Sequence, residues 1–107
     1  GRMMEEIVLL ETKIAKRTKQ VFQLQFAVGE FDMVVFDPQN ACSEIYEIKH
    51  SDKIAKEQCR HLLDPKKCAE TEFRYGKILS KNVIYRGAKD RFGDINYLNV
   101  EEYLQGL

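Results

Sequence analysis

Three charged residues near the middle of the chain are spaced so that they could carry out chemistry. Glu47 and Lys49 are two residues apart, and strand residues at that spacing leave the same face, about 7 Å apart. Asp32 belongs to the preceding apolar segment, and a hairpin through the turn at 37–40 could bring it beside Glu47. Such carboxylates can bind Mg²⁺ or Mn²⁺, and Lys49 could stabilise charge on a phosphate. A simpler interpretation is an ordinary ion pair of Glu and Lys on the sheet, with Asp32 as an incidental edge charge.

The distribution of charge agrees with a site that holds a cation next to a phosphodiester. Lys plus Arg and Asp plus Glu both number 17. From residue 20 to residue 48 there is no basic residue and there are five acidic ones, whereas 49–91 holds 12 basic and six acidic residues. A further basic cluster follows the first apolar segment. Carboxylates could hold the metal and the flanking cations the nucleic acid backbone, although solvated charge on surface elements explains the same pattern.

Length and composition predict one domain over residues 1–107. The chain is 44% hydrophobic and 32% charged, as in compact globular domains. No apolar run exceeds four residues, as at 7–10, which is too short for a membrane span of about 20 residues or for the apolar region of a signal peptide. The three cysteines show no CxxC pairing, which argues against a disulfide framework or a four-ligand zinc site. We therefore expect a cytoplasmic protein without membrane partners.

Hydrophobic periodicity predicts a helix followed by a three-stranded meander. Met3, Ile7, Leu10 and Ile14 recur at helical spacing, so a helix over 3–16 is expected to pack this stripe against a sheet. Strands are predicted over 21–28, 30–36 and 42–49. Regular alternation in the second strand gives two faces, with Phe31, Met33 and Val35 on one and Glu30, Asp32 and Val34 on the other.

The second half of the chain is predicted to add helices and short strands. Ser51 or Asp52 could cap a second helix that runs to about Leu63, and Asp64 with Pro65 resembles the start of a third that Gly76 ends. Short strands are predicted over 83–85 and 95–98, and a terminal helical turn, capped by Asn99, over 100–104. The expected fold class is α+β, with helices packed on the sheet.

Two further patterns favour a functional interpretation of the charged residues. Apolar residues bracket Glu47 and Lys49, so their strand is expected to be central, and buried charge requires a partner. Gln58 lies four residues from both Ile54 and Leu62, so on the predicted second helix it points inward. A buried glutamine needs a hydrogen-bond partner.

The chain resembles a known nuclease superfamily at these residues. Gly29-Glu30-Phe31-Asp32, a turn and then Glu47-Ile48-Lys49 is similar to the GExD…ExK core of the PD-(D/E)XK nucleases, in the same order of elements. Residues 4–8 (MEEIV), the YEIKHS segment and the later GKILSKNVIYRG resemble the C-terminal nuclease-like domain of prokaryotic AAA-type ATPases. The resemblance covers nearly the whole chain.

The resemblance implies a restriction-endonuclease-like α/β/α fold and roles for five residues. Asp32 and Glu47 would be the metal-binding carboxylates for Mg²⁺ or Mn²⁺, Lys49 the catalytic lysine and Gln58 the polar residue of the following helix. The first-helix glutamate would be Glu5. The periodicity disagrees here, because Glu6 flanks the stripe of the helix and Glu5 points away from it, so Glu6 stays in reserve.

Three hypotheses follow. The first is a metal-dependent deoxyribonuclease domain that hydrolyses DNA and is attached to an upstream AAA-type ATPase of the same polypeptide. The second keeps the fold without the chemistry, as a regulatory or docking module that binds DNA or the ATPase's other domains. The third is an unrelated α+β domain in which the ExK spacing is a coincidence. The sequence also allows a homo-oligomer.

Overall fold

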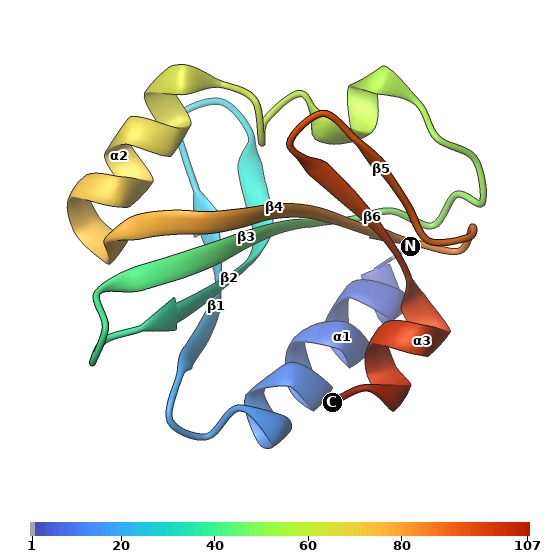
Figure 1. The fold of residues 1–107 in the computed structure, drawn as a ribbon, viewed down its shortest axis with the longest axis horizontal. Helices are drawn as coiled ribbons and strands as arrows, with labels where there is room; N and C mark the ends of the chain where they lie inside the picture. Colours follow the sequence, from blue (N-terminus) through green and yellow to red (C-terminus); the bar gives the residue numbers. More distant parts are fainter. Residues whose placement is uncertain (1) are drawn as a thin grey trace.

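A mixed six-stranded sheet organises the chain (Figure 1). The computed structural model describes residues 2–107, and the strand order is β1-β2-β3-β4-β6-β5. The first three strands form the predicted antiparallel meander, β4 and β6 continue the sheet parallel to β3, and β5 pairs antiparallel with β6. The strands are β1 (Gln20–Gln25), β2 (Glu30–Asp37), β3 (Cys42–Ile48), β4 (Lys77–Tyr85), β5 (Asp90–Phe92) and β6 (Ile95–Asn99).

Helices cover both faces of this sheet, which confirms the α+β fold class. Helices α1 (Arg2–Ala15) and α3 (Val100–Gln105) lie side by side on one face, and α2 (Pro65–Tyr75) lies on the other (Figure 1). Each face has its own apolar cluster. Val8, Met33, Val35, Tyr46 and Ile84 pack on the side of α1, whereas Phe31, Val34, Ile45, Leu62 and Val83 pack on the side of α2.

Helix α1 forms as predicted, but the prediction of its buried face was wrong. Met3, Ile7, Leu10 and Ile14 are exposed by 74%, 46%, 57% and 54%. The fully buried residues are Val8, in the cluster beneath the helix, and Thr12, whose hydroxyl lies 2.9 Å from the hydroxyl of Tyr103 on α3. The helix is apolar around much of its circumference, so its contacts with the sheet and α3 decide which side is buried.

The predicted second helix, from Ser51 or Asp52 to Leu63, is wrong. A loop leads instead to a single 3₁₀ turn, η1 (Lys56–Cys59). The Ser51 hydroxyl accepts a hydrogen bond from the Lys53 backbone N–H at 3.0 Å, which forms a local turn. Such side-chain contacts to the backbone compete with helix formation. Ile54 is accordingly exposed, while Leu62 reaches the core.

An irregularity in β2 changes the alternation that the sequence predicts. Phe22 pairs with Val34 and Leu24 with Phe31, so Asp32 and Met33 together lie opposite one residue of β1. This is the arrangement of a β-bulge, which redirects side chains. Phe31 and Val34 consequently share the α2 side, while Met33 and Val35 share the α1 side. The expectation that Phe31, Met33 and Val35 share a face was therefore wrong.

The helix ends in the second half agree with the capping signals. Asp64 accepts hydrogen bonds from the backbone of Lys66 and Lys67 at the start of α2, and Gly76 ends it at φ 77°. Asn99 caps α3 by accepting from the Glu102 N–H. The strand predicted over 83–85 extends to the whole of β4, because β3 pairs with it along its length. Strand β5 was not predicted.

Across residues 2–107, no helix combines the length and apolar character that crossing a membrane would require.

The buried face of α1 can be tested by matched truncations. Val8→Ala should lower the free energy of unfolding by about 2 kcal/mol, because it removes two buried methyl groups and leaves a cavity. Leu10→Ala, on the exposed side, should change it by less than about 0.5 kcal/mol. Urea unfolding at protein concentrations where the chain is monomeric measures both. Equal losses for the two variants would contradict the orientation of α1.

Candidate active site

The Asp32 carboxylate occupies a place that a backbone carbonyl would normally hold. Regular pairing between β2 and β3 begins at Met33 and Tyr46. Beyond this pair, two residues after Tyr46, the backbone N–H of Ile48 donates to Asp32 Oδ2 at 2.7 Å. Asp32 is buried. The carboxylate is therefore held in one orientation between the two strands, at the bulge.

Glu47 lies on the neighbouring strand and is the most buried charged residue of this group. It is 1% exposed. Its Oε2 lies 3.5 Å from Lys49 Nζ, and the Lys49 side chain is 38% exposed. The other oxygen, Oε1, is buried and finds no hydrogen-bond partner among the residues that the structure describes. An unpartnered buried acceptor is costly to the folded state.

The environment of Glu47 holds a proton on this carboxyl at neutral pH. Burial, reinforced by a hydrogen bond with the Asp32 carboxyl and by its charge, raises the pKa of Glu47 to about 9, and the cation of Lys49 opposes this effect only in part. Two neighbouring carboxyls in a low-dielectric site cannot both be ionised without a further positive charge. Burial of the two groups side by side therefore favours the protonated form of Glu47.

Glu5, on α1, faces the same site. Partial burial raises the pKa of Glu5, with the charges of Asp32 and Glu30 adding to the effect and that of Lys49 opposing it. Glu6 is exposed. The periodicity had favoured Glu6 because it assumed that the apolar stripe is buried. Since the opposite side of α1 packs on the sheet, Glu5 is the helix glutamate that lies near the carboxylates.

Glu30 is an acidic member of the site to which the sequence analysis gave no role. Partial burial and the neighbouring Asp32 raise the pKa of Glu30, and Gln23 donates a hydrogen bond to its carboxylate. The sequence did contain a signal for its place in the site, because Glu30 belongs to the GExD segment and lies two residues before Asp32.

Gln58 does not join this group through any described contact. It is buried, but its side chain accepts from the Ala55 N–H and donates to the Lys53 carbonyl, both at 2.8 Å. The hydrogen-bond partner expected for an inward glutamine is thus the backbone of its own loop. Gln58 therefore shapes the segment 53–58 instead of facing the carboxylates.

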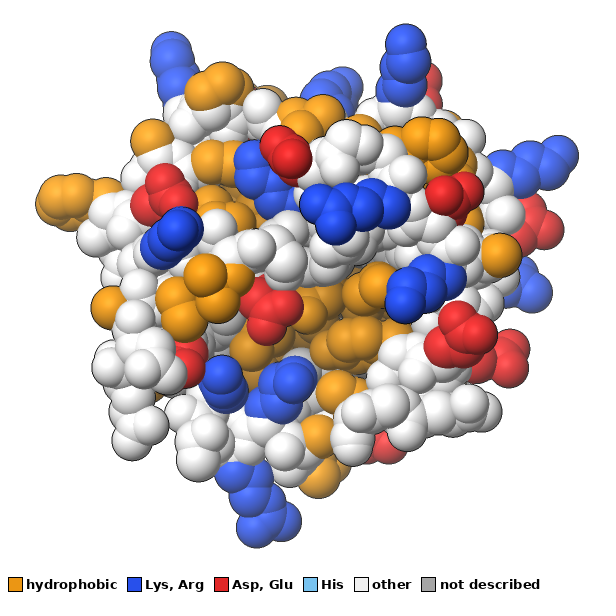
Figure 2. All heavy atoms as spheres, viewed as in Figure 1, with side chains coloured by type: hydrophobic (Ala, Val, Ile, Leu, Met, Phe, Trp, Pro, Cys, Tyr) orange, Lys and Arg blue, Asp and Glu red, His pale blue; other side chains and the backbone are white. Residues whose placement is uncertain are grey.

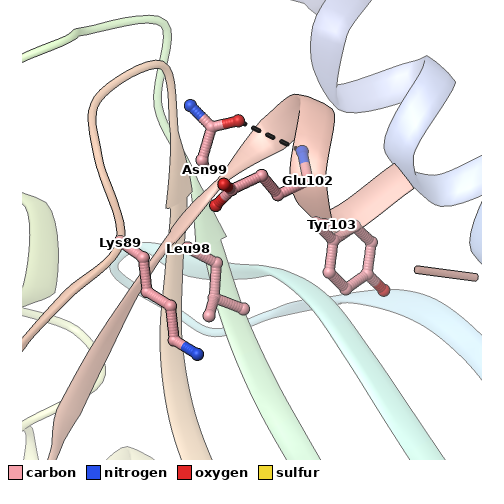
Figure 3. Close-up of a pocket in the computed structure, with 5 residues that line it drawn as sticks. All are labelled: Lys89, Leu98, Asn99, Glu102 and Tyr103. Carbon is pink, nitrogen blue, oxygen red and sulfur yellow. Dashed lines mark hydrogen bonds between the residues drawn. The ribbon is translucent and has the colours of Figure 1, made fainter. Parts of the chain in front are cut away.

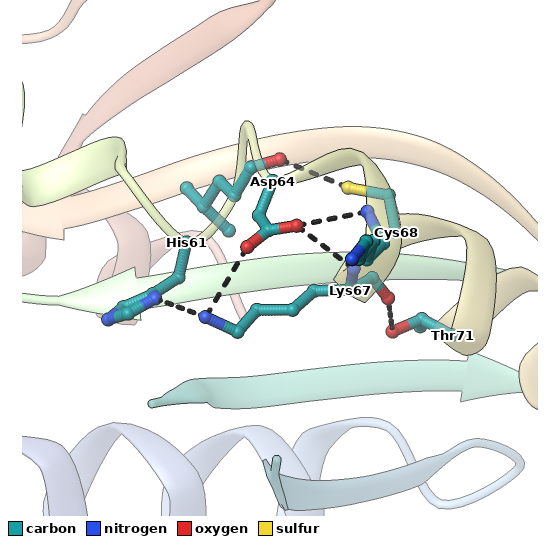
Figure 4. A network of polar contacts seen from close by, with 7 residues as sticks. His61, Asp64, Lys67, Cys68 and Thr71 are labelled. Carbon is teal, nitrogen blue, oxygen red and sulfur yellow. Dashed lines mark hydrogen bonds and ion pairs between the residues drawn. The ribbon is translucent and has the colours of Figure 1, made fainter. Parts of the chain in front are cut away.

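His61 approaches the site from a segment distant in sequence. Its ring packs on Gly29, where φ is 84° and a Cβ atom would overlap the imidazole. Lys67 Nζ lies 2.8 Å from His61 Nδ1 and 3.6 Å from the Asp64 carboxylate (Figure 4). Burial, together with the charges of Lys67, Arg60 and Lys49, lowers the pKa of His61. No local sequence signal identifies it, because its contact with Gly29 is tertiary.

The donor set fits a divalent cation whose remaining coordination positions are filled by water and substrate. Within residues 2–107 there is no cluster of three or more His, Cys, Asp or Glu side chains arranged as a metal cage. Mg²⁺, however, is usually bound by one or two carboxylates, with waters and phosphate oxygens filling the other positions. Asp32 and the unpartnered Oε1 of Glu47 provide such a pair.

The surface hollows that the structure describes do not include these carboxylates. Hydrophobic side chains line a hollow on the face shown in Figure 2, between the sheet and the helices below it. A pocket of about 200 Å³ lies between β6 and α3 and is lined by Lys89, Leu98, Asn99, Glu102 and Tyr103 (Figure 3). It shares no residue with the acidic site and contains no pair of carboxylates.

Comparisons with family models, curated proteins and solved structures found no match for this chain. The family resemblance of the GExD and ExK segments thus stays a prediction, and the function must be argued from the site itself.

The proton on Glu47 predicts a specific dependence of stability on pH. Because folding raises the pKa of Glu47, its contribution to stability is complete below the unfolded pKa near 4.5 and is lost as pH rises towards about 9. The free energy of unfolding should fall by up to about 1.4 kcal/mol per pH unit in this window. Glu47→Gln should remove this component. Urea unfolding at a series of pH values measures it.

Glu57→Gln is the matched control, because Glu57 is exposed on η1. Its pH profile should follow that of the parent. If Glu47→Gln also keeps the parent's profile, Glu47 does not hold a proton in the folded protein.

Proposed function

We propose that this chain is a metal-dependent nuclease domain that hydrolyses phosphodiester bonds of DNA. The observation that carries the proposal is the buried, unpartnered Glu47 Oε1 beside Asp32 and within reach of Lys49. A buried acceptor atom without a partner is costly to folding and favours a ligand that supplies the missing interaction. A divalent cation would do so.

Asp32 and Glu47 are the residues that would hold the cation. The Ile48 N–H fixes Asp32 through Oδ2, which leaves Oδ1 free of this bond. Glu47 would lose its proton as the cation binds. When bound, Mg²⁺ or Mn²⁺ would lower the pKa of a water molecule and neutralise charge on the phosphate.

Lys49 and Glu5 are the residues available to assist the transfer. The water oxygen would attack phosphorus, one ester P–O bond would break, and the departing oxygen would take a proton. Lys49, partly exposed next to Glu47, can donate a hydrogen bond to the attacking water or to a phosphate oxygen. Glu5 can accept the proton of the water, since its raised pKa makes it a stronger base than an ordinary carboxylate.

The charges around the site support a nucleic acid substrate. Lys49 lies next to Glu47 and its side chain is partly exposed. On the side of Gly29, the cations of Arg60 and Lys67 act on His61. Positive groups from separate segments thus flank the acidic pair, as contacts with a phosphate backbone require.

A second candidate function is a catalytically inactive module that binds DNA or the other domains of an attached AAA-type ATPase. The 3.5 Å contact between Glu47 and Lys49 favours it, because a docking module tolerates a site that its own side chains close. Such a module needs neither metal binding nor Lys49. The two functions therefore differ in the response to metal and to substitution of this lysine.

The nuclease proposal predicts that metal binding and catalysis can be separated. The parent should gain thermal stability with Mn²⁺, roughly 2.7 kcal/mol at about 100 times the dissociation constant, and should cut DNA in its presence. Lys49→Met should keep the metal response and lose at least about 100-fold in cleavage rate. Asp32→Asn and Glu47→Gln should lose both. Thermal unfolding and gel-based cleavage of single-stranded and duplex DNA measure the two properties.

Lys53→Met is a suitable control, because Lys53 is an exposed lysine of the following loop whose described contacts are made by its backbone. It should behave as the parent in both assays. Metal-dependent stabilisation that persists in both carboxylate variants, or cleavage that survives Lys49→Met, would contradict the proposal.

A further inference from the structure

Helix α1 carries an apolar stripe that no other part of the described chain covers. Its members are Met3, Ile7, Leu10 and Ile14, each exposed by at least 46%. They follow one another at spacings of four, three and four residues, which is the pattern of a coiled-coil seam. Ile7 and Ile14 then occupy a positions, and Met3 and Leu10 occupy d positions. Four large apolar side chains in line on one exposed helix face mark an interaction surface.

We propose that two copies of this chain associate through antiparallel pairing of their α1 helices. In this arrangement each a residue meets a d residue of the other copy. Ile7 packs against the partner's Leu10, and Met3 packs against the partner's Ile14. The two-fold axis repeats both contacts, so the whole stripe is buried in four layers.

The charges beside the stripe select a second copy in this orientation. Glu6 and Lys13 occupy g positions, and both are exposed. In the antiparallel pair Glu6 lies opposite the partner's Lys13, and symmetry forms this contact twice. In a parallel pair Glu6 would instead lie opposite the partner's Glu11, which is repulsive. The antiparallel arrangement also places the positive N-terminal end of each helix dipole beside the negative C-terminal end of the other.

The apolar surface extends beyond the helix itself. A groove of about 320 Å³ lies between α1 and α3, where Met4, Val100 and Leu104 continue the surface from Met3 and Ile7. Stable interfaces bury about 1,200–2,000 Å² in total. Since a helix of 14 residues is short, we expect a dimer of modest affinity that uses this groove in addition to the stripe.

The dimer is independent of the proposed nuclease activity. Glu5, Val8 and Thr12 lie on the side of α1 that faces the body of the domain. The stripe lies on the other side of the helix. Pairing therefore covers the stripe and leaves the carboxylates of Asp32 and Glu47 outside the interface.

Sedimentation velocity over a concentration series, up to about 1 mM, tests the proposal. The parent should convert from monomer to dimer as concentration rises. Leu10→Glu should remain monomeric, whereas Leu79→Glu, at an equally exposed leucine outside α1, should dimerise as the parent does. Both variants should unfold at temperatures close to that of the parent, because both positions are exposed.

Charge reversal tests the orientation. Glu6→Lys alone and Lys13→Glu alone should each weaken dimerisation about tenfold, since each turns two attractive contacts into repulsive ones. The double variant should restore it. A parent that stays monomeric throughout the series would overturn the proposal and assign the stripe to a different partner. A double variant no stronger than the single ones would overturn the antiparallel register.

Discussion

The burial of two carboxylates between neighbouring strands is the constraint on which the rest of the structure depends. A sheet interior normally holds apolar side chains, and an ionised carboxylate there is unfavourable unless it is bonded or paired. Asp32 meets this requirement through the Ile48 N–H, and Glu47 meets it in part through Lys49 and through a raised pKa. The bulge opposite Gln23 makes this arrangement compatible with continuous strands.

The neighbouring helix and loop are arranged around these two carboxylates. Helix α1 presents Glu5 to the carboxylates and buries Val8 and Thr12, and this orientation turns its apolar stripe to solvent. On the side of Gly29, the ring of His61 packs where a larger residue would not fit. The site thus brings together strands, a helix and a loop, while the same geometry leaves the apolar stripe of α1 exposed.

Sequence patterns predicted the elements whose signals are local. The meander, the cap of α2 at Asp64 and the cap of α3 at Asn99 depend on alternation and on short-range hydrogen bonds. The spacing of Glu47 and Lys49 likewise predicted their proximity, which is confirmed by the 3.5 Å contact. Local rules were sufficient for these features because neighbours in the chain determine them.

Features that depend on tertiary contacts could not be predicted in this way. The bulge at Asp32 appears in the pairing of β1 with β2, and regular alternation gives no sign of it. The periodicity of α1 located an apolar face correctly, but the contact of Thr12 with Tyr103 on α3 belongs to the opposite side. The buried amide of Gln58 finds its hydrogen-bond partners in the backbone of its own loop, so its burial did not indicate a contact with the carboxylates.

The central claim is that Asp32 and Glu47 form a site that exchanges a proton for a metal ion. Titration of the chain with Mn²⁺ by calorimetry at pH 7, in two buffers of different ionisation enthalpy, tests it most directly. The account predicts saturable binding with release of about one proton per ion, and loss of both in Glu47→Gln. Absence of binding, or binding that releases no proton and persists in Glu47→Gln, would contradict it.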